Sequence, residues 1–323
     1  MPLVFLFASL ALIAGCVSHV PMSTEYEGPR ELPIAIVDRF ESDAVILTTL
    51  DEEFGDEHAR PWRGFTVRDV TLPSNAEEES SIQFEYYDVD GDDPTPVVIL
   101  LPIFDGRPTV TRYFARYFAS QGWAALTLDR DRDLLENIAE PEQAIRANML
   151  EYRRVLDWVA QQPEIDSGSI GLFGISFGAM DAVMLAALDE RIDALVVAMA
   201  GGDLAYLFMN TNYRPVARTV NGMLEATGLT RAALLEALEK RFATNPLMMG
   251  PYVDAQRVLM ILTRTDAIVP FEAQQALRTS LGTPETLYLP TGHRTSIVYF
   301  PLLRASAREF FARQFGAAPP STN

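Results

Sequence analysis

Cysteine is nearly absent, since Cys16 is the only one in 323 residues. The folded domain therefore has no disulfide framework, no cysteine-ligated metal site and no cysteine nucleophile. No cluster of histidine, aspartate and glutamate has the spacing of metal ligands, and no glycine-rich phosphate loop is present. We therefore expect neither a metal nor a cofactor.

Positive charge is also scarce, with 26 basic against 44 acidic residues and a net charge of −18. A nucleic-acid partner requires a basic face that displaces counterions from phosphates, so this class of partner is excluded. Apolar residues make up 48% of the chain and charged residues 22%, which is typical of a globular protein. The length suits one catalytic domain with a large core.

No apolar run is long enough to cross a membrane, because the uncharged residues 1–15 fall short of the roughly 20 that a spanning helix needs. This run is typical of a secretory signal peptide that ends in small residues. The ending Leu12-Ile13-Ala14-Gly15-Cys16 resembles the bacterial lipoprotein signal, which implies cleavage before Cys16 and acylation of its thiol. The sequence departs from that signal in having no Lys or Arg before the apolar run.

A plain secretory signal with an incidental cysteine is the alternative interpretation. We expect a signal peptide at 1–15, a polar tether at 16–30, a folded domain at 31–317 and a flexible tail at 318–323. The expected location is the periplasmic side of a bacterial cell envelope, with lipid anchoring favoured in the outer membrane. The membrane would then be a partner through the N-terminal lipid.

Strands and helices alternate from Gly64 onward, whereas residues 31–57 are ambiguous, with possible strands at 33–37 and 44–50. Alternating or continuous apolar runs predict strands at 65–72, 82–89, 97–101, 123–128, 170–173, 194–199, 258–262 and 286–289. Apolar residues at helical spacing predict helices at 113–120, 141–162, 179–188, 271–281 and near 297–315.

The order of these elements predicts an α/β fold with a mainly parallel, twisted sheet and helices on both faces. The stretch of about 203–252 interrupts the alternation, because it is rich in Leu, Met and Ala and contains no strand. It is too long for a simple connection. We expect a helical insertion that lies over the carboxyl edge of the sheet.

The motif Gly174-Ile175-Ser176-Phe177-Gly178 connects a predicted strand to a predicted helix. Gly-x-Ser-x-Gly is weak evidence alone, but a strand–turn–helix context is what a nucleophile elbow requires. The turn is so tight that Cβ atoms beside the serine would collide, hence the two glycines. Ser176 is the candidate nucleophile, and a glycine-rich turn without chemistry is the alternative.

A serine hydroxyl needs a neighbouring base, and the chain has only three histidines. His19 lies in the tether and His58 lies before the first clear strand. Only His293 follows a late strand, in the loop Leu289-Pro290-Thr291-Gly292-His293. His293 is therefore the candidate base, with a solvent-facing loop histidine as the alternative.

The base needs a carboxylate that fixes its tautomer and stabilises the imidazolium. Asp266 follows the strand at 258–262, and the chain order Ser, Asp, His is that of α/β-hydrolases. Asp203, after the preceding strand, is the rival acid, and Asp254 is a weaker one. An ion-paired surface aspartate remains the structural alternative for Asp266.

Two backbone N–H groups should receive the oxyanion that forms when a carbonyl is attacked. One belongs to Phe177, the residue after the nucleophile. The other should come from the loop Pro102-Ile103-Phe104-Asp105-Gly106, after the strand at 97–101. Since proline has no N–H, Ile103 or Phe104 must donate, and by position we favour Phe104.

Residues 64–315 resemble the α/β-hydrolase superfamily, and the segments around Ser176, Asp266 and His293 are similar to its dienelactone-hydrolase-like and acyl-esterase branch. The resemblance implies hydrolysis of an ester, thioester or amide through an acyl-enzyme without a cofactor. It does not identify the small-molecule or acyl ester substrate. The loop after 97–101 lacks the His-Gly or glycine run of many lipases and esterases, which leaves the subfamily open.

Other activities use the same three residues, so an amidase, a peptidase or an acyltransferase is an alternative within the enzyme class. The alternative from another class is a non-catalytic hydrolase fold that serves as an envelope binding or scaffold lipoprotein. Such proteins usually lose one of the three residues, and this chain retains all of them.

Overall fold

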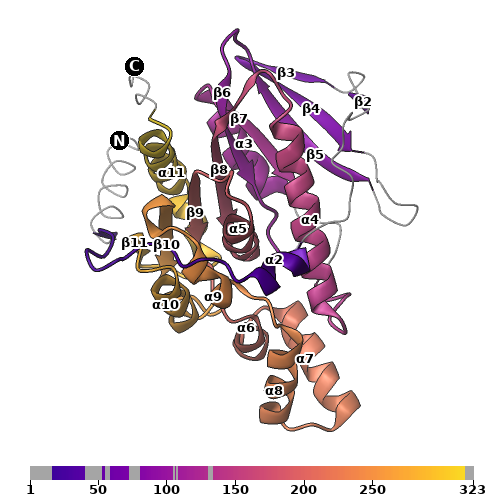
Figure 1. Cartoon of the computed structure of the whole chain (residues 1–323). Helices are drawn as coiled ribbons and strands as arrows, with labels where there is room; N and C mark the ends of the chain where they lie inside the picture. Colours follow the sequence, from indigo (N-terminus) through magenta and orange to yellow (C-terminus); the bar gives the residue numbers. More distant parts are fainter. Residues whose placement is uncertain are drawn as a thin grey trace, which may run out of the picture.

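One mixed sheet organises the protein, and helices pack on both of its faces (Figure 1). The computed structural model describes residues 17–40, 53–54, 59–72, 81–104, 106, 108–129 and 134–316. The sheet has 11 strands in the order β1-β11-β10-β9-β8-β6-β7-β5-β4-β2, and β3 pairs with β4 outside this path. The strands are β1 (Ser18–Val20), β2 (Glu53–Phe54), β3 (Arg60–Trp62), β4 (Phe65–Leu72), β5 (Ile82–Val89), β6 (Thr95–Leu100), β7 (Ala124–Leu128), β8 (Ile165–Ile175), β9 (Ala194–Ala198), β10 (Val258–Thr263) and β11 (Glu285–Leu289).

The helices alternate with these strands along most of the chain. They are α2 (Ile34–Phe40), α3 (Pro108–Ser120), α4 (Pro141–Val159), α5 (Phe177–Leu188), α6 (Leu204–Asn210), α7 (Arg214–Thr227), α8 (Arg231–Arg241), α9 (Pro246–Met249), α10 (Phe271–Ser280) and α11 (Phe300–Gln314). Short 3₁₀ turns are η2 (Gly250–Tyr252), η3 (Ala255–Arg257) and η4 (Thr295–Tyr299).

The centre of the sheet is parallel, from β7 through β6, β8, β9 and β10 to β11, whereas β4 and β5 join it as an antiparallel pair. Every residue of β9 and β10 is buried, as expected of strands with both faces covered. The predicted mainly parallel α/β sheet is therefore confirmed. Because parallel strands share a carboxyl edge, the loops after β6, β8, β10 and β11 all meet there.

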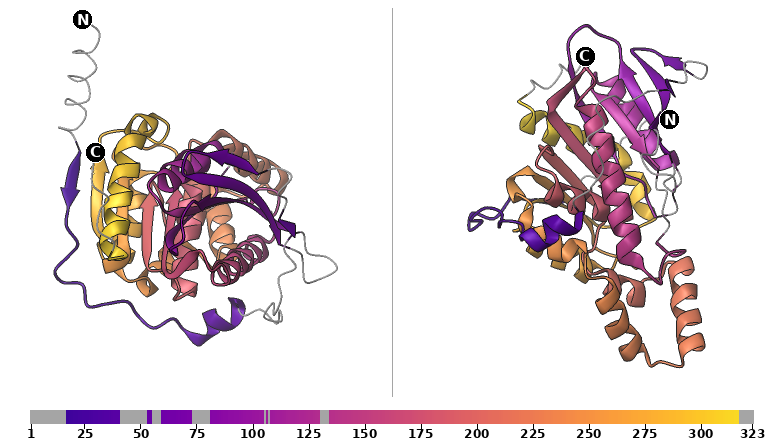
Figure 2. Two further views of the ribbon diagram at one scale, coloured as in Figure 1. Left: turned by 90° about the horizontal axis from the view of Figure 1, so that it is seen from above. Right: turned by 45° about the vertical axis from the view of Figure 1, so that its right-hand side comes forward.

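Helices lie on both faces of the sheet (Figure 2), and one apolar layer holds them on each face. On one face, α4, α5 and α10 contribute residues such as Trp158, Val183 and Leu277 to the larger cluster. On the opposite face, α3 and α11 contribute aromatic residues, among them Phe114 and Phe311. The rigid sandwich fixes the strand ends from which the functional loops extend.

Four helices, α6 to α9, lie between β9 and β10, where the sequence interrupts its alternation of strands and helices. In Figure 1, α6, α7 and α8 lie beyond the carboxyl ends of the strands, and α7 and α8 project from the body, whereas α9 packs beside α5 and α10. Val216 and Val220 are the buried residues of α7, and Leu234 and Leu238 are those of α8. These helices therefore pack through one apolar stripe each.

The possible strand at 33–37 is wrong, because residues 34–37 form part of helix α2. Ile36 and Phe40, four residues apart, are buried together on one face of this helix. The side chain of Arg153 on α4 donates to the carbonyl of Phe40 at 3.0 Å. A short apolar run cannot distinguish helix from strand by periodicity alone, which explains the ambiguity. Residues 44–50 lie outside the described residues, but Glu53 and Phe54 do join the sheet through β4.

Residues 17–30, most of the predicted polar tether at 16–30, lie along the domain. Ser18–Val20 pair antiparallel with β11 and so cover its outer edge, which would otherwise present unpaired N–H and C=O groups. The hydroxyl of Tyr26 accepts from the amide of Ala255 at 3.0 Å. These contacts are made by backbone groups and by the single side chain of Tyr26. They therefore produce no periodic apolar pattern that the sequence could reveal.

The proposed signal peptide at 1–15, the candidate lipid site Cys16 and the tail at 318–323 lie outside the described residues. In the part of the chain that the structure describes, no helix combines the length and apolar character needed to cross a bilayer.

Candidate active site

Ser176 occupies the sharp turn between β8 and α5, in a strained backbone conformation with φ 57° and ψ −121°. A positive φ is unfavourable for a residue with a Cβ atom, so the surrounding structure must impose it. The Ser176 amide donates to the carbonyl of Ala198 on β9 at 2.8 Å, which fixes the turn to the neighbouring strand. This is the geometry that exposes a serine hydroxyl at the carboxyl edge of such a sheet.

Gly174 and Gly178 make that turn possible, as the sequence predicts. A Cβ atom on Gly174 would lie 2.4 Å from the backbone of Ala179. A Cβ atom on Gly178 would lie 2.5 Å from the carbonyl oxygen of Leu101. Gly178 therefore also lets the first turn of α5 approach the loop after β6, where the second oxyanion donor is expected.

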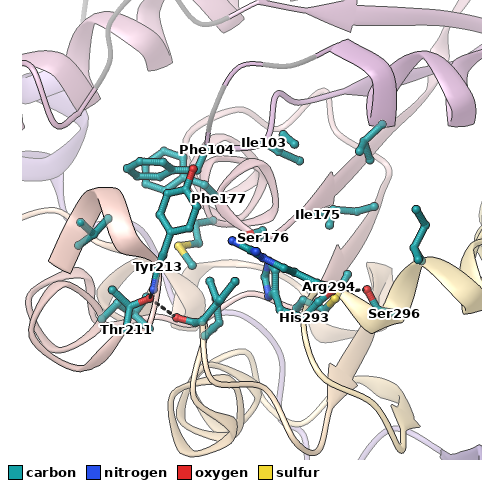
Figure 3. A pocket seen from close by; sticks show the side chains of 18 of the residues that line it. Ile103, Phe104, Ile175, Ser176, Phe177, Thr211, Tyr213, His293, Arg294 and Ser296 are labelled. Carbon is teal, nitrogen blue, oxygen red and sulfur yellow. Dashed lines mark hydrogen bonds between the residues drawn. The ribbon is translucent and has the colours of Figure 1, made fainter. Parts of the chain in front are cut away.

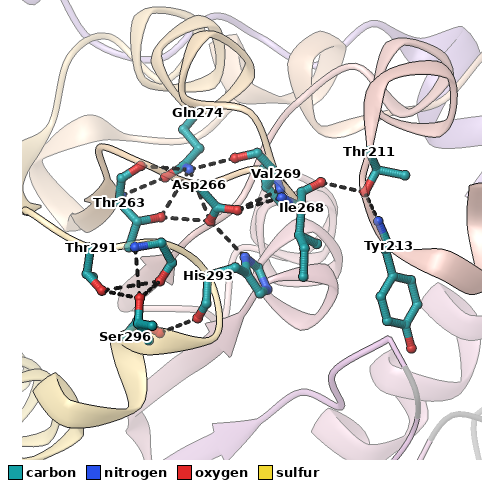
Figure 4. A network of polar contacts seen from close by, with 12 residues as sticks. Thr211, Tyr213, Thr263, Asp266, Ile268, Val269, Gln274, Thr291, His293 and Ser296 are labelled. Carbon is teal, nitrogen blue, oxygen red and sulfur yellow. Dashed lines mark hydrogen bonds and ion pairs between the residues drawn. The ribbon is translucent and has the colours of Figure 1, made fainter.

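His293 and Asp266 form a hydrogen-bonded pair, with 2.8 Å between His293 Nδ1 and Asp266 Oδ2 (Figure 4). The Asp266 side chain is fully buried, and that of His293 is 15% exposed. A neutral imidazole that donates from Nδ1 carries its lone pair on Nε2. His293 also lines the same cavity as Ser176 (Figure 3). The structure thus gathers the three residues that the sequence proposes for catalysis.

The Asp266 carboxylate is satisfied on both oxygens, as a buried charge requires. Oδ1 accepts from the amides of Ile268 at 2.8 Å and Val269 at 2.9 Å. Oδ2 accepts from the Thr263 hydroxyl at 2.8 Å, in addition to its contact with His293. These donors fix the orientation of the carboxylate.

Gln274 on α10 is a structural partner of the acid that the sequence analysis missed. Its side chain is fully buried, and its amide nitrogen donates to the carbonyl of Val269 at 2.8 Å and approaches Asp266 Oδ2 at 3.4 Å. Its oxygen accepts from the amide of Thr263 at 3.0 Å. Gln274 thereby joins the end of β10 to the acid loop. The signal was a polar residue on the buried face of a helix, beside Ala273 and Leu277.

The loop that carries His293 is fixed by its own hydrogen bonds. Ser296 donates from its hydroxyl to the His293 carbonyl at 2.6 Å, and Thr295 accepts from the Gly292 amide at 3.1 Å. The Thr265 amide donates to the Thr291 carbonyl at 3.1 Å and so joins this loop to the acid loop. Gly292 allows this approach, because a Cβ there would lie 2.9 Å from the Thr265 oxygen.

The two rival acids have other positions. Asp203 caps helix α6 by accepting from the Tyr206 amide at 2.9 Å. Asp254 caps the turn η3 by accepting from the Gln256 amide at 3.0 Å. Asp266 is the acid that contacts His293.

The helices between β9 and β10 are joined to the acid loop by polar contacts (Figure 4). Thr211 donates from its hydroxyl to the carbonyl of Ile268 at 2.7 Å and accepts from the amide of Tyr213 at 3.0 Å. The Tyr213 ring in turn packs against the Phe104 ring, with centroids 5.5 Å apart. One wall of the cavity is thus attached to both the acid loop and the loop after β6.

The two predicted oxyanion donors lie on adjoining loops at the cavity. The Phe104 and Phe177 rings meet edge to face, with centroids 5.2 Å apart, and both residues line the cavity. Phe177 is the first residue of α5, where backbone N–H groups do not belong to the helical ladder. The assignment of their amides as oxyanion donors stays a prediction.

The cavity has a volume of about 480 Å³ and a mainly apolar wall. Its apolar residues come from the sheet edge, from α5, α6 and α7 and from η4, and include Ile103, Phe104, Met180, Met199, Leu207, Phe208, Val216 and Ile297. Its polar residues are Ser176, Thr211, Tyr213, His293, Arg294 and Ser296. Among the described residues, no group of three His, Cys, Asp or Glu side chains is placed to hold a metal ion.

Residues 141–279 match the X-Pro dipeptidyl-peptidase (S15) family, a stretch that includes Ser176 and Asp266. A 31.7 kDa uncharacterized protein of the traX-finO intergenic region of Escherichia coli is 34% identical over 113 residues, which cover 34% of this chain and 39% of that protein. The polyketide transferase claH of Penicillium crustosum is 34% identical over 103 residues, or 31% of this chain and 33% of that one. The chain thus spans between a third and two fifths of these relatives.

Solved structures cover far more of the chain. The acetyl xylan esterase of Paenibacillus sp. R4 superposes with a TM-score of 0.61 at 15% identity and covers 85% of this chain and 99% of its own. The protein has the fold of the α/β-hydrolase superfamily. The matching family is described as a peptidase and the superposed structure as an esterase, so both relatives are hydrolases by description.

The glycines of the Ser176 turn provide a direct test of this geometry. We expect Gly174→Ala and Gly178→Ala each to lower the free energy of unfolding by about 1–3 kcal/mol, because the new methyl groups overlap backbone atoms. Gly222→Ala on α7 is the matched control, since a Cβ there meets nothing within 4 Å. It should raise stability by about 0.5–1 kcal/mol, the usual gain within a helix. Denaturant unfolding measures all three, and neutral substitutions at 174 and 178 would contradict the account.

Proposed function

We propose that the protein is a serine hydrolase that cleaves carboxylic ester, thioester or amide bonds through a Ser-His-Asp triad and an acyl-enzyme. One observation carries the proposal. A strained serine shares a cavity with a histidine whose Nδ1 lies 2.8 Å from a buried carboxylate oxygen. A glycine-rich turn without chemistry would need neither the partnered histidine nor the cavity.

In the proposed reaction, Ser176 Oγ attacks the substrate carbonyl while His293 Nε2 takes the serine proton. The tetrahedral oxyanion is stabilised by the amides of Phe177 and Phe104. When it collapses, the imidazolium returns the proton to the leaving alcohol, thiol or amine, and the acyl group stays on Ser176. Water then repeats the sequence, with His293 as base, and releases the acid. Asp266 stabilises the imidazolium without exchanging a proton.

The cavity favours an acyl ester over the peptide substrate that the matching family's name describes. A dipeptidyl-peptidase must bind the α-ammonium group of its substrate, which calls for a carboxylate in the site. The described residues that line this cavity include no Asp or Glu. Their apolar side chains suit an acyl or aryl group instead.

We further propose that the protein is a lipoprotein of the bacterial envelope, anchored through Cys16 on the periplasmic side. The support is the sequence Leu12–Cys16 and the position of β1, whose first residue follows two positions later. An acyl group on Cys16 would hold the β11 edge of the sheet close to the bilayer surface.

Ser176→Ala should abolish both ester hydrolysis and covalent labelling by a fluorophosphonate probe, because no other residue supplies the attacking oxygen. The fold should persist, since alanine retains the Cβ atom of serine, and circular dichroism checks this. A Ser176→Ala protein that still labels and turns over esters would show that another residue is the nucleophile.

Asp266→Asn should lower kcat by about 10⁴-fold, the scale reported for loss of the correct histidine tautomer in a chymotrypsin-type enzyme. Asp203→Asn is the matched control, because it removes one charge at constant size and its amide oxygen can still cap α6. We expect it to keep most of the activity with 4-nitrophenyl butyrate. If Asp203→Asn is inactive and Asp266→Asn keeps most of its activity, the triad acid is Asp203, after β9.

Cys16→Ser should release the mature protein from the membrane fraction after expression in a Gram-negative host. Stable anchoring requires more than one acyl chain, since a single chain gives only marginal binding. Mass spectrometry of the wild-type N-terminus should find acylated Cys16. Cys16→Ser protein that stays in the membrane fraction at wild-type levels would remove the case for a lipid anchor.

A further inference from the structure

Arg294 stands out among the residues that line the cavity. It follows His293 directly, and it is the only Lys, Arg, Asp or Glu side chain among the described lining residues. Figure 3 shows the arginine side chain projecting from the His293 loop toward the part of the cavity where Ser176 and His293 lie. A positive charge therefore lies in a mainly apolar cavity beside the proposed nucleophile.

The Arg294 side chain has no hydrogen bond, ion pair or ring contact with any residue that the structure describes. Other arginines of the same protein are engaged: Arg191 pairs with Asp189 at 2.7 Å, and Arg264 lies over the Tyr288 ring at 4.6 Å. A guanidinium presents five donors in a planar fork that matches a carboxylate. The guanidinium donors of Arg294 are therefore available to a ligand in the cavity.

We propose that Arg294 binds a carboxylate of the substrate, so that the preferred ester carries a negative charge a few bonds from the scissile carbonyl. This inference rests on the proposed hydrolase function and adds the substrate class. The net charge of −18 disfavours the approach of anions on average, so their recognition calls for a local cation such as Arg294. Arg294 is itself exposed, so its guanidinium can meet an anion that arrives from solvent.

Two kinds of ester satisfy this requirement. The carboxylate can lie on the acyl side, as in a monoester of a dicarboxylic acid, or on the alcohol side, as in an ester of a hydroxy acid. In both, hydrolysis consumes one water and yields an acid and an alcohol, and the carboxylate bound by Arg294 takes no part in bond breaking. Arg294 would act as a specificity-determining residue.

The experiment compares kcat/KM for two matched pairs of esters. Mono(4-nitrophenyl) glutarate is paired with 4-nitrophenyl pentanoate for the acyl side, and 4-acetoxybenzoate with 4-acetoxybenzamide for the alcohol side. The proteins are wild type, Arg294→Met, Arg294→Lys and the control Arg218→Met. Arg218, an exposed arginine on α7, lies outside the cavity wall.

Arg294→Met should lower kcat/KM for one anionic ester by about tenfold to a hundredfold, the scale of a lost charge-assisted hydrogen-bond pair. The matched neutral ester should change by less than about twofold, and lysine should restore part of the loss. Arg218→Met should leave the ratio of kcat/KM for the anionic ester to that for the neutral ester unchanged in both pairs. The pair that responds identifies the side of the ester that carries the charge.

An equal fall for neutral and anionic esters, or no fall for either anionic ester, would overturn the proposal while leaving the hydrolase function intact. A protein that hydrolyses none of the four esters would instead count against the proposed function. Calorimetric binding of mono(4-nitrophenyl) glutarate to Ser176→Ala protein, with and without Arg294→Met, decides the role of Arg294 in that case. Loss of binding with Arg294→Met supports the carboxylate site, and unchanged or undetectable binding overturns it.

Discussion

The left-handed backbone of Ser176 is the constraint on which the arrangement of the site depends. This conformation fits the sheet only because Gly174 and Gly178 have no Cβ atom. The absence of these atoms lets the end of β8, the start of α5 and the loop after β6 approach one another at distances that a Cβ atom would prevent. The neighbouring strands β6 and β9 are packed between two helical layers, and their packing maintains the strained conformation of Ser176. The fold therefore holds one side chain at the carboxyl edge in a conformation that an isolated turn would not keep.

A second constraint is the burial of the Asp266 charge. Amides of its own loop, the Thr263 hydroxyl and His293 together satisfy the carboxylate, and Gln274 ties that loop to the end of β10. The acid loop, the histidine loop and the helices after β9 are all linked to one another by such contacts. A substrate would thus meet a site whose geometry is largely fixed before binding, which is the arrangement that lowers reorganisation during reaction.

Much of this was predictable from the sequence, because the relevant signals are local or arise by elimination. Apolar periodicity defined the central strands, the Gly-x-Ser-x-Gly turn indicated Ser176, and the scarcity of histidine left His293. The sequence could mark Gln274 as a polar residue on a buried helix face, but neither its partners nor the role of Arg294 was predictable, because both depend on which loops the fold brings together. The docking of residues 17–30 also escaped prediction, since backbone pairing at a sheet edge leaves no mark on composition.

The central claim is that an acyl group passes through Ser176. Acid quenching of the protein during steady turnover of 4-nitrophenyl acetate, followed by peptide mapping, would trap and locate that group. The account predicts one acetyl group on the peptide that contains Ser176, and its disappearance once substrate is exhausted. An acetyl group on another residue that forms and decays at the rate of turnover would contradict it.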